Sequence, residues 1–260
     1  MYAFITIKHT MSAYGPLCTE FYDLDKPHPP EDAFSYYLAR ARDCGNPVLE
    51  PMCGSGRFLI PLLAAGIDVH GVDNAPSMLA ACRKRALALG LKLPVLYEQA
   101  LEKLSLPHSY RMALVPAGSI GLIDSDEKLA IVLRALRNHL QPGALLLLEL
   151  LTPRPESTQT RALQPRILQV DPETTLSYHC HEHVISAGHI VRYDGVYERR
   201  HGGNVVAHEE ETLFLRIRTP AELTKLLLMS GFVKASVIRN PEYGWLHDNH
   251  ALLIEAMADA

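Results

Sequence analysis

The part of this chain that most constrains its fold is residues 48–58, where a short apolar strand ends in Glu50 and a turn with Gly54 and Gly56 opens a helix. Glycines let the backbone approach a ligand closely. The helix that follows presents unpaired N–H groups to a polar or anionic group. A second apolar run ends at Asp73, 19 positions after Gly54, which is the usual reach of a carboxylate that accepts hydrogen bonds from ribose hydroxyls. The pattern predicts a nucleoside-cofactor site.

Two cofactor classes compete for this loop, and a third possibility needs no ligand. A dinucleotide site requires G-x-G-x-x-G, with a small third residue for close helix packing, but Leu59 occupies that position. S-adenosylmethionine (SAM) has a cationic amino group, which an acidic residue just before the glycines can meet, and Glu50 supplies it. Glycines also occur in ordinary strand–turn–helix connections. The combination of Glu50 with Asp73 favours SAM.

The motifs around these residues resemble those of the class I SAM-dependent methyltransferases, and the resemblance covers most of the chain. The first family motif is similar to Glu50-Pro51-Met52-Cys53-Gly54-Ser55-Gly56-Arg57, and the second is similar to Gly71-Val72-Asp73-Asn74-Ala75-Pro76-Ser77-Met78. The resemblance implies that Asp73 binds the ribose hydroxyls and that Met78 lies against the adenine.

Later segments extend the resemblance. The adenine-edge segment is similar to Tyr97–Leu101, although Ala100 stands where the family usually has Asp. The adenine amino group would then meet Gln99 or a backbone carbonyl. The fourth motif, beside the transferred methyl group, is similar to Arg111–Ser119, and the turn before the fifth strand is similar to Leu140–Ala144. The implied cofactor-binding residues are Tyr14, Tyr22, Glu50, Gly54, Gly56, Arg57, Asp73, Asn74, Met78, Gln99, Ala100, Leu101 and Pro116.

Composition limits the remaining possibilities. The 260 residues are 48% apolar and 21% charged, which is ordinary for a globular protein. A net charge of −4 argues against nucleic acid as the main substrate. Five cysteines without a C-x-x-C pair favour a reducing compartment. We find no apolar run long enough to cross a membrane and no signal-peptide pattern, so we expect a cytoplasmic protein. The oligomeric state does not follow from the sequence.

Apolar runs and helical patterns alternate over the first part of the chain, which predicts a parallel sheet with helices on both faces. The expected strands are 48–50, 69–72, 95–97, 113–115 and 144–150, and the expected helices are 31–43, 58–65, 77–89 and 127–139. After a predicted loop at 152–166, strand-like alternation indicates an antiparallel meander of three or four strands, with turn signals at 186–188, 194–195 and 202–204. A helix at 220–230 and strands at 233–238 and 251–256 complete the pattern.

We therefore expect an α/β protein with a seven-stranded, mostly parallel, Rossmann-like methyltransferase sheet and an antiparallel β insertion. The predicted parts are an N-terminal lid and first helix (1–46), a SAM-binding core (47–151 and 219–260) and an insertion that covers the substrate (152–218). Tyr14 or Tyr22 would close over the methionine end of SAM, although both also suit ordinary packing at a domain edge.

The insertion contains polar clusters. His179, His181 and His183 alternate along one expected strand face, where imidazoles can bind zinc or act as a general base. Same-face neighbours lie about 7 Å apart, too far for all three to reach one metal, so a solvated or lid-lining face is favoured and we predict no metal site. His179 and His181 remain candidate catalytic residues. The acidic residues 209–211 and the arginines 216 and 218 are also interpreted mainly as solvated charged faces.

The sequence thus predicts a SAM-dependent methyltransferase that acts on O or N of a small-molecule acceptor. A catalytically inactive SAM-binding partner protein and a nucleic-acid or protein methyltransferase remain alternatives. Methyl transfer from a sulfonium depends chiefly on alignment, so an enzyme of this type needs no obvious base.

Overall fold

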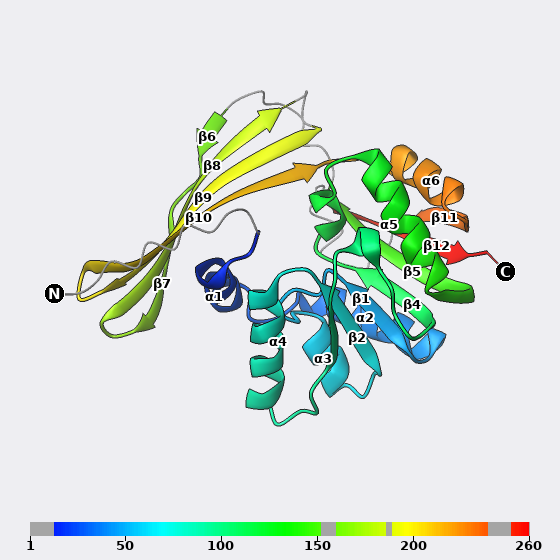
Figure 1. Ribbon diagram of the computed structural model, residues 1–260, viewed down its shortest axis with the longest axis horizontal. Coiled ribbons are helices and arrows are strands. Elements are labelled where there is room, and N and C mark those ends of the chain that lie inside the picture. The colour runs from blue at the N-terminus through cyan, green and yellow to red at the C-terminus, as the bar shows by residue number, and fades with distance from the viewer. Residues whose placement is uncertain (1–12, 152–159, 186–188, 239–250, 260) are drawn as a thin grey trace.

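The computed structural model describes residues 13–151, 160–185, 189–238 and 251–259. It has a core sheet covered by helices and a second sheet that extends away from the core (Figure 1). The core sheet has seven strands in the order β11-β12-β5-β4-β1-β2-β3, with only β12 antiparallel to its neighbours. The predicted α/β class and sheet type are confirmed. The core strands are β1 (Val48–Pro51), β2 (Val69–Asp73), β3 (Val95–Glu98), β4 (Tyr110–Val115), β5 (Leu140–Leu151), β11 (Phe232–Ile238) and β12 (Ala251–Ala258).

Helices cover both faces of this sheet because its central strands are apolar on both sides. The side chains of β5 alternate between two hydrophobic clusters, with Leu146 and Leu148 in one and Leu145 and Leu147 in the other. The first cluster includes α5 and α6, and the second includes α2, α3 and α4. The helices are α1 (Pro16–Asp25), α2 (Glu31–Cys44), α3 (Leu59–Ala64), α4 (Pro76–Ala88), α5 (Asp126–Asn138) and α6 (Pro220–Met229), with short 3₁₀ helices η1 (Leu101–Lys103) and η2 (Ser119–Leu122).

Local signals explain several boundaries. The Ser125 side chain accepts a hydrogen bond from the Lys128 N–H and begins α5. A capping box between Thr219 and Glu222 begins α6, with Pro220 in the first turn as predicted. No helix in the described part of the chain is long and apolar enough to cross a membrane.

The second sheet has five antiparallel strands rather than three or four. They are β6 (Thr160–Ala162), β7 (Arg166–Asp171), β8 (Thr174–Ile185), β9 (Ile190–His201) and β10 (Asn204–Arg216). The prediction of a loop throughout 152–166 is therefore wrong at β6, whose three exposed residues carry no strand-like pattern of their own. The turn signal at 186–188 lies outside the described residues.

Two glycine signals in this sheet have different outcomes. Gly202 and Gly203 both have positive φ (+55° and +82°) and join β9 to β10, as predicted. The turn predicted at Asp194-Gly195 is wrong, because Gly195 lies in the middle of β9 opposite Cys180. A Cβ at Gly195 would lie 2.6 Å from Cε2 of Tyr178, so the glycine there makes room for an aromatic ring.

Helix α1 was not predicted as a helix, and it connects the two sheets (Figure 1). Phe21 packs against Tyr178 and Tyr197 of the second sheet. On its other side, Asp23 forms an ion pair with Arg85 of α4 at 3.2 Å. The segment expected to be part of a lid is therefore an ordered helix between the core and the insertion.

Candidate functional site

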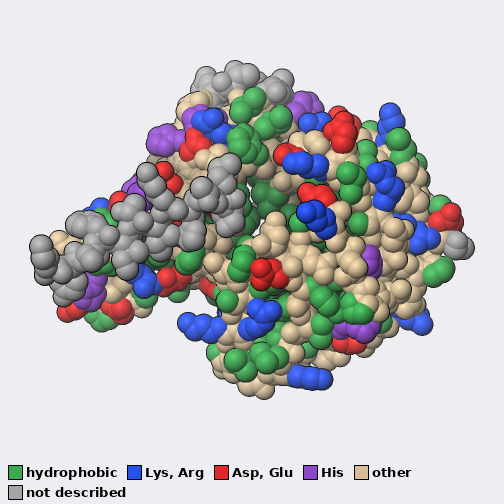
Figure 2. Space-filling view, in the orientation of Figure 1, with side chains coloured by type: hydrophobic (Ala, Val, Ile, Leu, Met, Phe, Trp, Pro, Cys, Tyr) green, Lys and Arg blue, Asp and Glu red, His purple; other side chains and the backbone are tan. Residues whose placement is uncertain are grey.

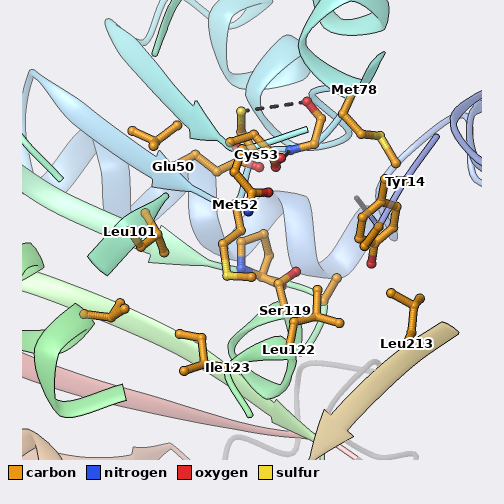
Figure 3. Close-up of a pocket in the computed structure, with 18 of the residues that line it drawn as sticks. Tyr14, Glu50, Met52, Cys53, Met78, Leu101, Ser119, Leu122, Ile123 and Leu213 are labelled. Atoms are coloured by element: carbon orange, nitrogen blue, oxygen red, sulfur yellow. Dashed lines mark hydrogen bonds between the residues drawn. The ribbon is translucent and has the colours of Figure 1, made fainter. Parts of the chain in front are cut away.

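A cavity of about 340 Å³ lies at the carboxyl ends of β1, β2 and β4, between the core and β10. Figure 2 shows the surface hollowed between the insertion and the core, with hydrophobic side chains inside the hollow. Figure 3 shows Glu50 and Leu101 on one side of the cavity and Tyr14 and Leu213 on another. All of the cofactor-binding residues predicted from the sequence line this cavity, with the exception of Gly56 and Ala100.

Glu50 is the most unusual group in the cavity wall. Its side chain is buried at the end of β1, with 1% of the residue exposed. Burial, and then the nearby carboxylate of Asp73, raise the pKa of Glu50 well above 4.5. Its Oε2 atom has no hydrogen-bond partner among the described residues. A buried carboxylate oxygen without a partner is costly, so this atom fits a ligand that brings a cationic donor.

Asp73 holds the glycine loop in place. Its Oδ2 atom accepts a hydrogen bond from the Gly54 N–H at 2.8 Å, and its Oδ1 atom accepts one from the Ala75 N–H at 2.9 Å. Gly54 has a φ of +53°, which glycine adopts at little cost. Burial raises the pKa of Asp73, and the backbone hydrogen bonds oppose that rise. The carboxylate therefore shapes the loop and also faces the cavity.

Gly56 and Ala100 lie outside the cavity wall. A Cβ at Gly56 would lie 2.6 Å from Sγ of Cys82 and 2.8 Å from Cγ1 of Ile60. Gly56 therefore lets the turn pack closely against α3 and α4, which is a structural reason for a glycine in this motif. Ala100 immediately precedes η1 with an extended backbone, while the neighbouring Gln99 and Leu101 line the cavity.

Two tyrosines from the N-terminal part of the described chain line the cavity: Tyr22 lies in α1, and Tyr14 lies two residues before this helix. Tyr14 has a φ of +65°, and its N–H donates a hydrogen bond to Oε1 of Glu211 on β10. Burial, followed by the charge of Glu211, raises the pKa of Tyr14. Burial also raises the pKa of Tyr22, although the nearby Arg57 opposes this effect.

The insertion contributes directly to the site. Thr212, Leu213 and Phe214 of β10 line the cavity. On the same strand, Glu209 accepts hydrogen bonds from the N–H groups of Leu17 and Cys18, at 2.9 and 3.1 Å, in the first turn of α1. Carboxylates are favourable at a helix N-terminus.

Glu209 and Glu211 were interpreted from the sequence as part of a solvated face, and this interpretation is wrong for both. Both side chains bind the segment around the start of α1. The arginines at the end of the insertion are also bound, since Arg216 and Arg218 both pair with Asp126 at the start of α5, at 3.1 and 2.9 Å.

The histidines of β8 lie elsewhere. His179 and His181 are exposed, whereas the alternate residues Cys180 and Glu182 are buried on the other face of the strand. Neither histidine lines the cavity, and His183 pairs with Asp194 at 3.0 Å. This placement agrees with the solvated-face interpretation and gives the catalytic one no support. Within the described residues, no group of three or more His, Cys, Asp or Glu side chains is placed to hold a metal ion.

The sequence did not single out Glu149 of β5, which lies behind the loop that follows β4. Its Oε2 atom accepts a hydrogen bond from the N–H of Ala117 at 2.9 Å. Ala117 lines the cavity with a φ of +58°, and Met52 does so with a φ of +59°. Together with Tyr14, three non-glycine residues in the left-handed region therefore form parts of the wall, and such conformations concentrate at functional sites.

Comparisons with known proteins agree with this geometry. Residues 48–143 match a family model described as a methyltransferase domain, whereas no curated protein matches the chain. A sugar N-methyltransferase from a Streptoalloteichus species is 18% identical, with a TM-score of 0.74 over 97% of this chain and 98% of that one. A methyltransferase from Streptomyces caelestis is 20% identical, with a TM-score of 0.72 over 97% and 100%. An amino pentose methyltransferase from Micromonospora echinaspora, solved with SAM bound, is 18% identical, with a TM-score of 0.69 over 96% and 99%.

Proposed function

We propose that this chain is a class I SAM-dependent methyltransferase that transfers a methyl group from SAM to a nitrogen or oxygen atom of a small molecule. The match of residues 48–143 to a methyltransferase-domain model and the fold shared with solved methyltransferases support the family. The observation that carries this proposal is the partnerless Oε2 of Glu50, buried beside the glycine loop. An oxygen in that position suits the cationic amino group of SAM.

The other wall residues suit the rest of the cofactor. Asp73 keeps its carboxylate beside Gly54 and lines the cavity, which supports a role toward the ribose hydroxyls. Met78 and Leu101 offer apolar contacts for a purine, and Gln99 lies beside them on the wall. The side chain of Gln99 already bonds the backbone of Ser105 in both directions, at 2.9 and 3.1 Å. The adenine amino group would therefore have to share the Gln99 Oε1 atom with the Ser105 N–H, or donate to a backbone carbonyl instead.

The acceptor side supports a small molecule. Leu122, Ile123, Leu213 and Phe214 give that part of the wall an apolar character, and Ser119 and Thr212 add hydroxyl groups. β10 and Tyr14 border the cavity, and the chain carries a net charge of −4. A nucleic acid would instead require a basic face. The names of the sugar and amino pentose methyltransferases above suggest amino or hydroxyl sugars as the first acceptors to try.

The residues act mainly by alignment. SAM supplies a methyl group on a sulfonium, whose departing sulfur is already activated. The walls at Tyr14 and Ala117 restrict where an acceptor can lie, and holding two reactants in line can supply most of the acceleration. The acceptor's lone pair forms the new bond to the methyl carbon while the C–S electron pair returns to sulfur. A nucleophile that carries a proton releases it to solvent or to a nearby oxygen. We assign no histidine to this step.

Calorimetric titration with SAM, S-adenosylhomocysteine (SAH) and NAD tests the cofactor. We expect SAM and SAH to bind and NAD to bind far more weakly, and tighter binding of NAD would contradict the proposal. Incubation with methyl-labelled SAM and pools of amino- and hydroxyl-bearing small molecules then tests turnover. Binding without transfer to any pool would favour the alternative of an inactive SAM-binding partner protein.

The five cysteines support a cytoplasmic location. All five are free thiols, and four of them are buried. Free thiols persist in reducing compartments, where disulfides are rare. Localisation of the tagged protein by cell fractionation tests this part of the proposal.

A further inference from the structure

The loop after β4 has a backbone conformation that its sequence does not favour. The Ser119 N–H donates to the Pro116 carbonyl at 3.2 Å, and the two residues between them, Ala117 and Gly118, have φ values of +58° and +69°. This geometry matches a type I′ turn, which is built for Gly or Asn at both central positions. An L-residue such as alanine is disfavoured there by about 5- to 30-fold.

Only one of the two central residues is a glycine. At Gly118 the side chain is excluded, because a Cβ would lie 2.6 Å from Cγ of Leu151. Ala117 instead is exposed to the cavity and forms part of its wall. Some other interaction must therefore hold the alanine in the left-handed region.

Glu149 supplies that interaction from behind the wall. Its Oε2 accepts the Ala117 N–H at 2.9 Å and the Tyr37 hydroxyl at 3.3 Å. Glu149 is 7% exposed and Tyr37 is fully buried. A charge-assisted bond in a buried setting is about twice as strong as a neutral one. Glu149 is not among the residues that line the cavity, so it acts there indirectly, and Ala117 is the wall residue that it bonds directly.

The same device occurs at two other points of the wall. Asp73 accepts the N–H of Gly54, and Glu211 accepts the N–H of Tyr14, and both donors have positive φ. Glu149 differs from Asp73 in that it is not among the residues that line the cavity. Its contribution can therefore be separated from direct contact with a ligand.

We propose that Glu149 is a positioning residue that holds the turn at 116–119 in its left-handed form and thereby sets the cavity wall at Ala117. The consequence for ligand binding rests on the proposed function, whereas the consequence for the turn does not. Without the carboxylate, the turn relaxes toward conformations that alanine prefers. The apparent ligand affinity is then reduced in proportion to the fraction of molecules that keep the competent turn.

The test uses Glu149→Met, which keeps an unbranched side chain and removes the acceptor. We expect SAH binding, measured by calorimetry, to weaken by about 5- to 30-fold, the cost of a left-handed alanine. Adding Ala117→Gly should restore affinity to within about twofold, because glycine adopts the turn without help. Glu149→Gln keeps an acceptor oxygen and should retain most of the affinity.

Glu255 offers a matched control on the neighbouring strand β12. It binds the Tyr36 hydroxyl at 2.5 Å and Arg40 at 3.0 Å, both on α2, and is not among the residues that line the cavity. Glu255→Met should leave SAH affinity within about twofold of the wild type and gain nothing from Ala117→Gly. A loss in Glu149→Met that glycine at 117 fails to restore would overturn the proposal and indicate a general packing role.

Amide hydrogen exchange at Ala117, followed by NMR, tests the turn in the wild-type protein without any ligand. We expect this N–H to be protected by about 10- to 150-fold, the equivalent of a hydrogen bond to a charged group. Exchange at the rate of an unstructured chain would overturn the proposal even if Glu149→Met does not fold. If wild-type protein binds no SAH, the proposed function fails, while protection at Ala117 still reports on Glu149.

Discussion

Replacing Glu50 with glutamine should have opposite effects on ligand binding and on the stability of the ligand-free protein. The substitution keeps the shape of the side chain and removes its charge. In the wild type, Oε2 is buried without a hydrogen-bond partner among the described residues. The wild-type carboxylate therefore costs stability until a cationic donor binds it.

The expected loss of binding follows from the lost charge. A hydrogen bond to a charged group contributes about 1.5–3 kcal/mol, so SAM should bind about 10- to 150-fold more weakly to Glu50→Gln. Wild-type affinity should also fall as the pH is lowered through the pKa of Glu50, because the protonated carboxyl no longer attracts a cation. The variant should lack that dependence.

The effect on stability has the opposite sign. Burial and Asp73 raise the pKa of Glu50 above 4.5 in the folded protein, so the native state binds more protons than the unfolded state between the two pKa values. The free energy of unfolding contributed by this group is fully present below the unfolded pKa and is lost as the pH rises through the folded pKa. Glutamine does not titrate, so ligand-free Glu50→Gln should lose less stability on the alkaline side.

Urea unfolding with and without SAH, repeated at several pH values on the acidic and the alkaline side of neutrality, measures both effects. Glu98, exposed at the end of β3 and absent from the cavity wall, provides a matched control as Glu98→Gln. Equal SAM affinity in wild type and Glu50→Gln would refute the assignment of Glu50 to the cationic group. A wild-type stability that follows the variant at every pH would refute the reasoning about its burial.

Three further perturbations test other parts of the site. Asp73→Ala should weaken SAM binding by at least about 1.5–3 kcal/mol in calorimetry, because it removes both the proposed ribose contact and the anchor of Gly54; unchanged affinity would contradict this role. Glu211→Ala removes the acceptor of the Tyr14 N–H and should weaken SAH binding about 2- to 13-fold, whereas no change would show that β10 does not hold Tyr14 in place. Alanine at His179, His181 or His183 of β8 should leave turnover within about twofold, and chelators should have no effect. A loss of about 10²–10⁴-fold at one position would instead support the general-base hypothesis.

The core and the cofactor loop could be predicted because their signals are local. Strand β1 ends within one residue of the expected position, and α5 spans 126–138 against an expected 127–139. Short apolar runs and capping residues mark these elements in the sequence without reference to any distant partner. The spacing from Gly54 to Asp73 identified a pair that the structure joins by a hydrogen bond of 2.8 Å.

Elements that depend on a distant partner were harder to predict. Helix α1 buries Phe21 against two tyrosines more than 150 positions away, and nothing in its own sequence identifies that partner. Gly195 resembles a turn residue in sequence, but its role is to accommodate the ring of Tyr178. Glycine has several structural uses, and only the packing around it separates them.

The carboxylates behind the cavity wall show most clearly why the sequence is insufficient. The run of acidic residues 209–211 in β10 looks the same in the sequence whether its carboxylates meet water or bind backbone N–H groups, as Glu209 and Glu211 do. Left-handed residues are recognised in a sequence mainly when they are glycine or asparagine, so Tyr14 and Ala117 give no such signal. Each is held by a carboxylate that lies far away along the chain. The sequence therefore predicts neither the left-handed conformation nor the carboxylate that stabilises it. The two residues of each pair explain one another only once the structure brings them together. The shape of this cavity thus depends on contacts that no single motif contains.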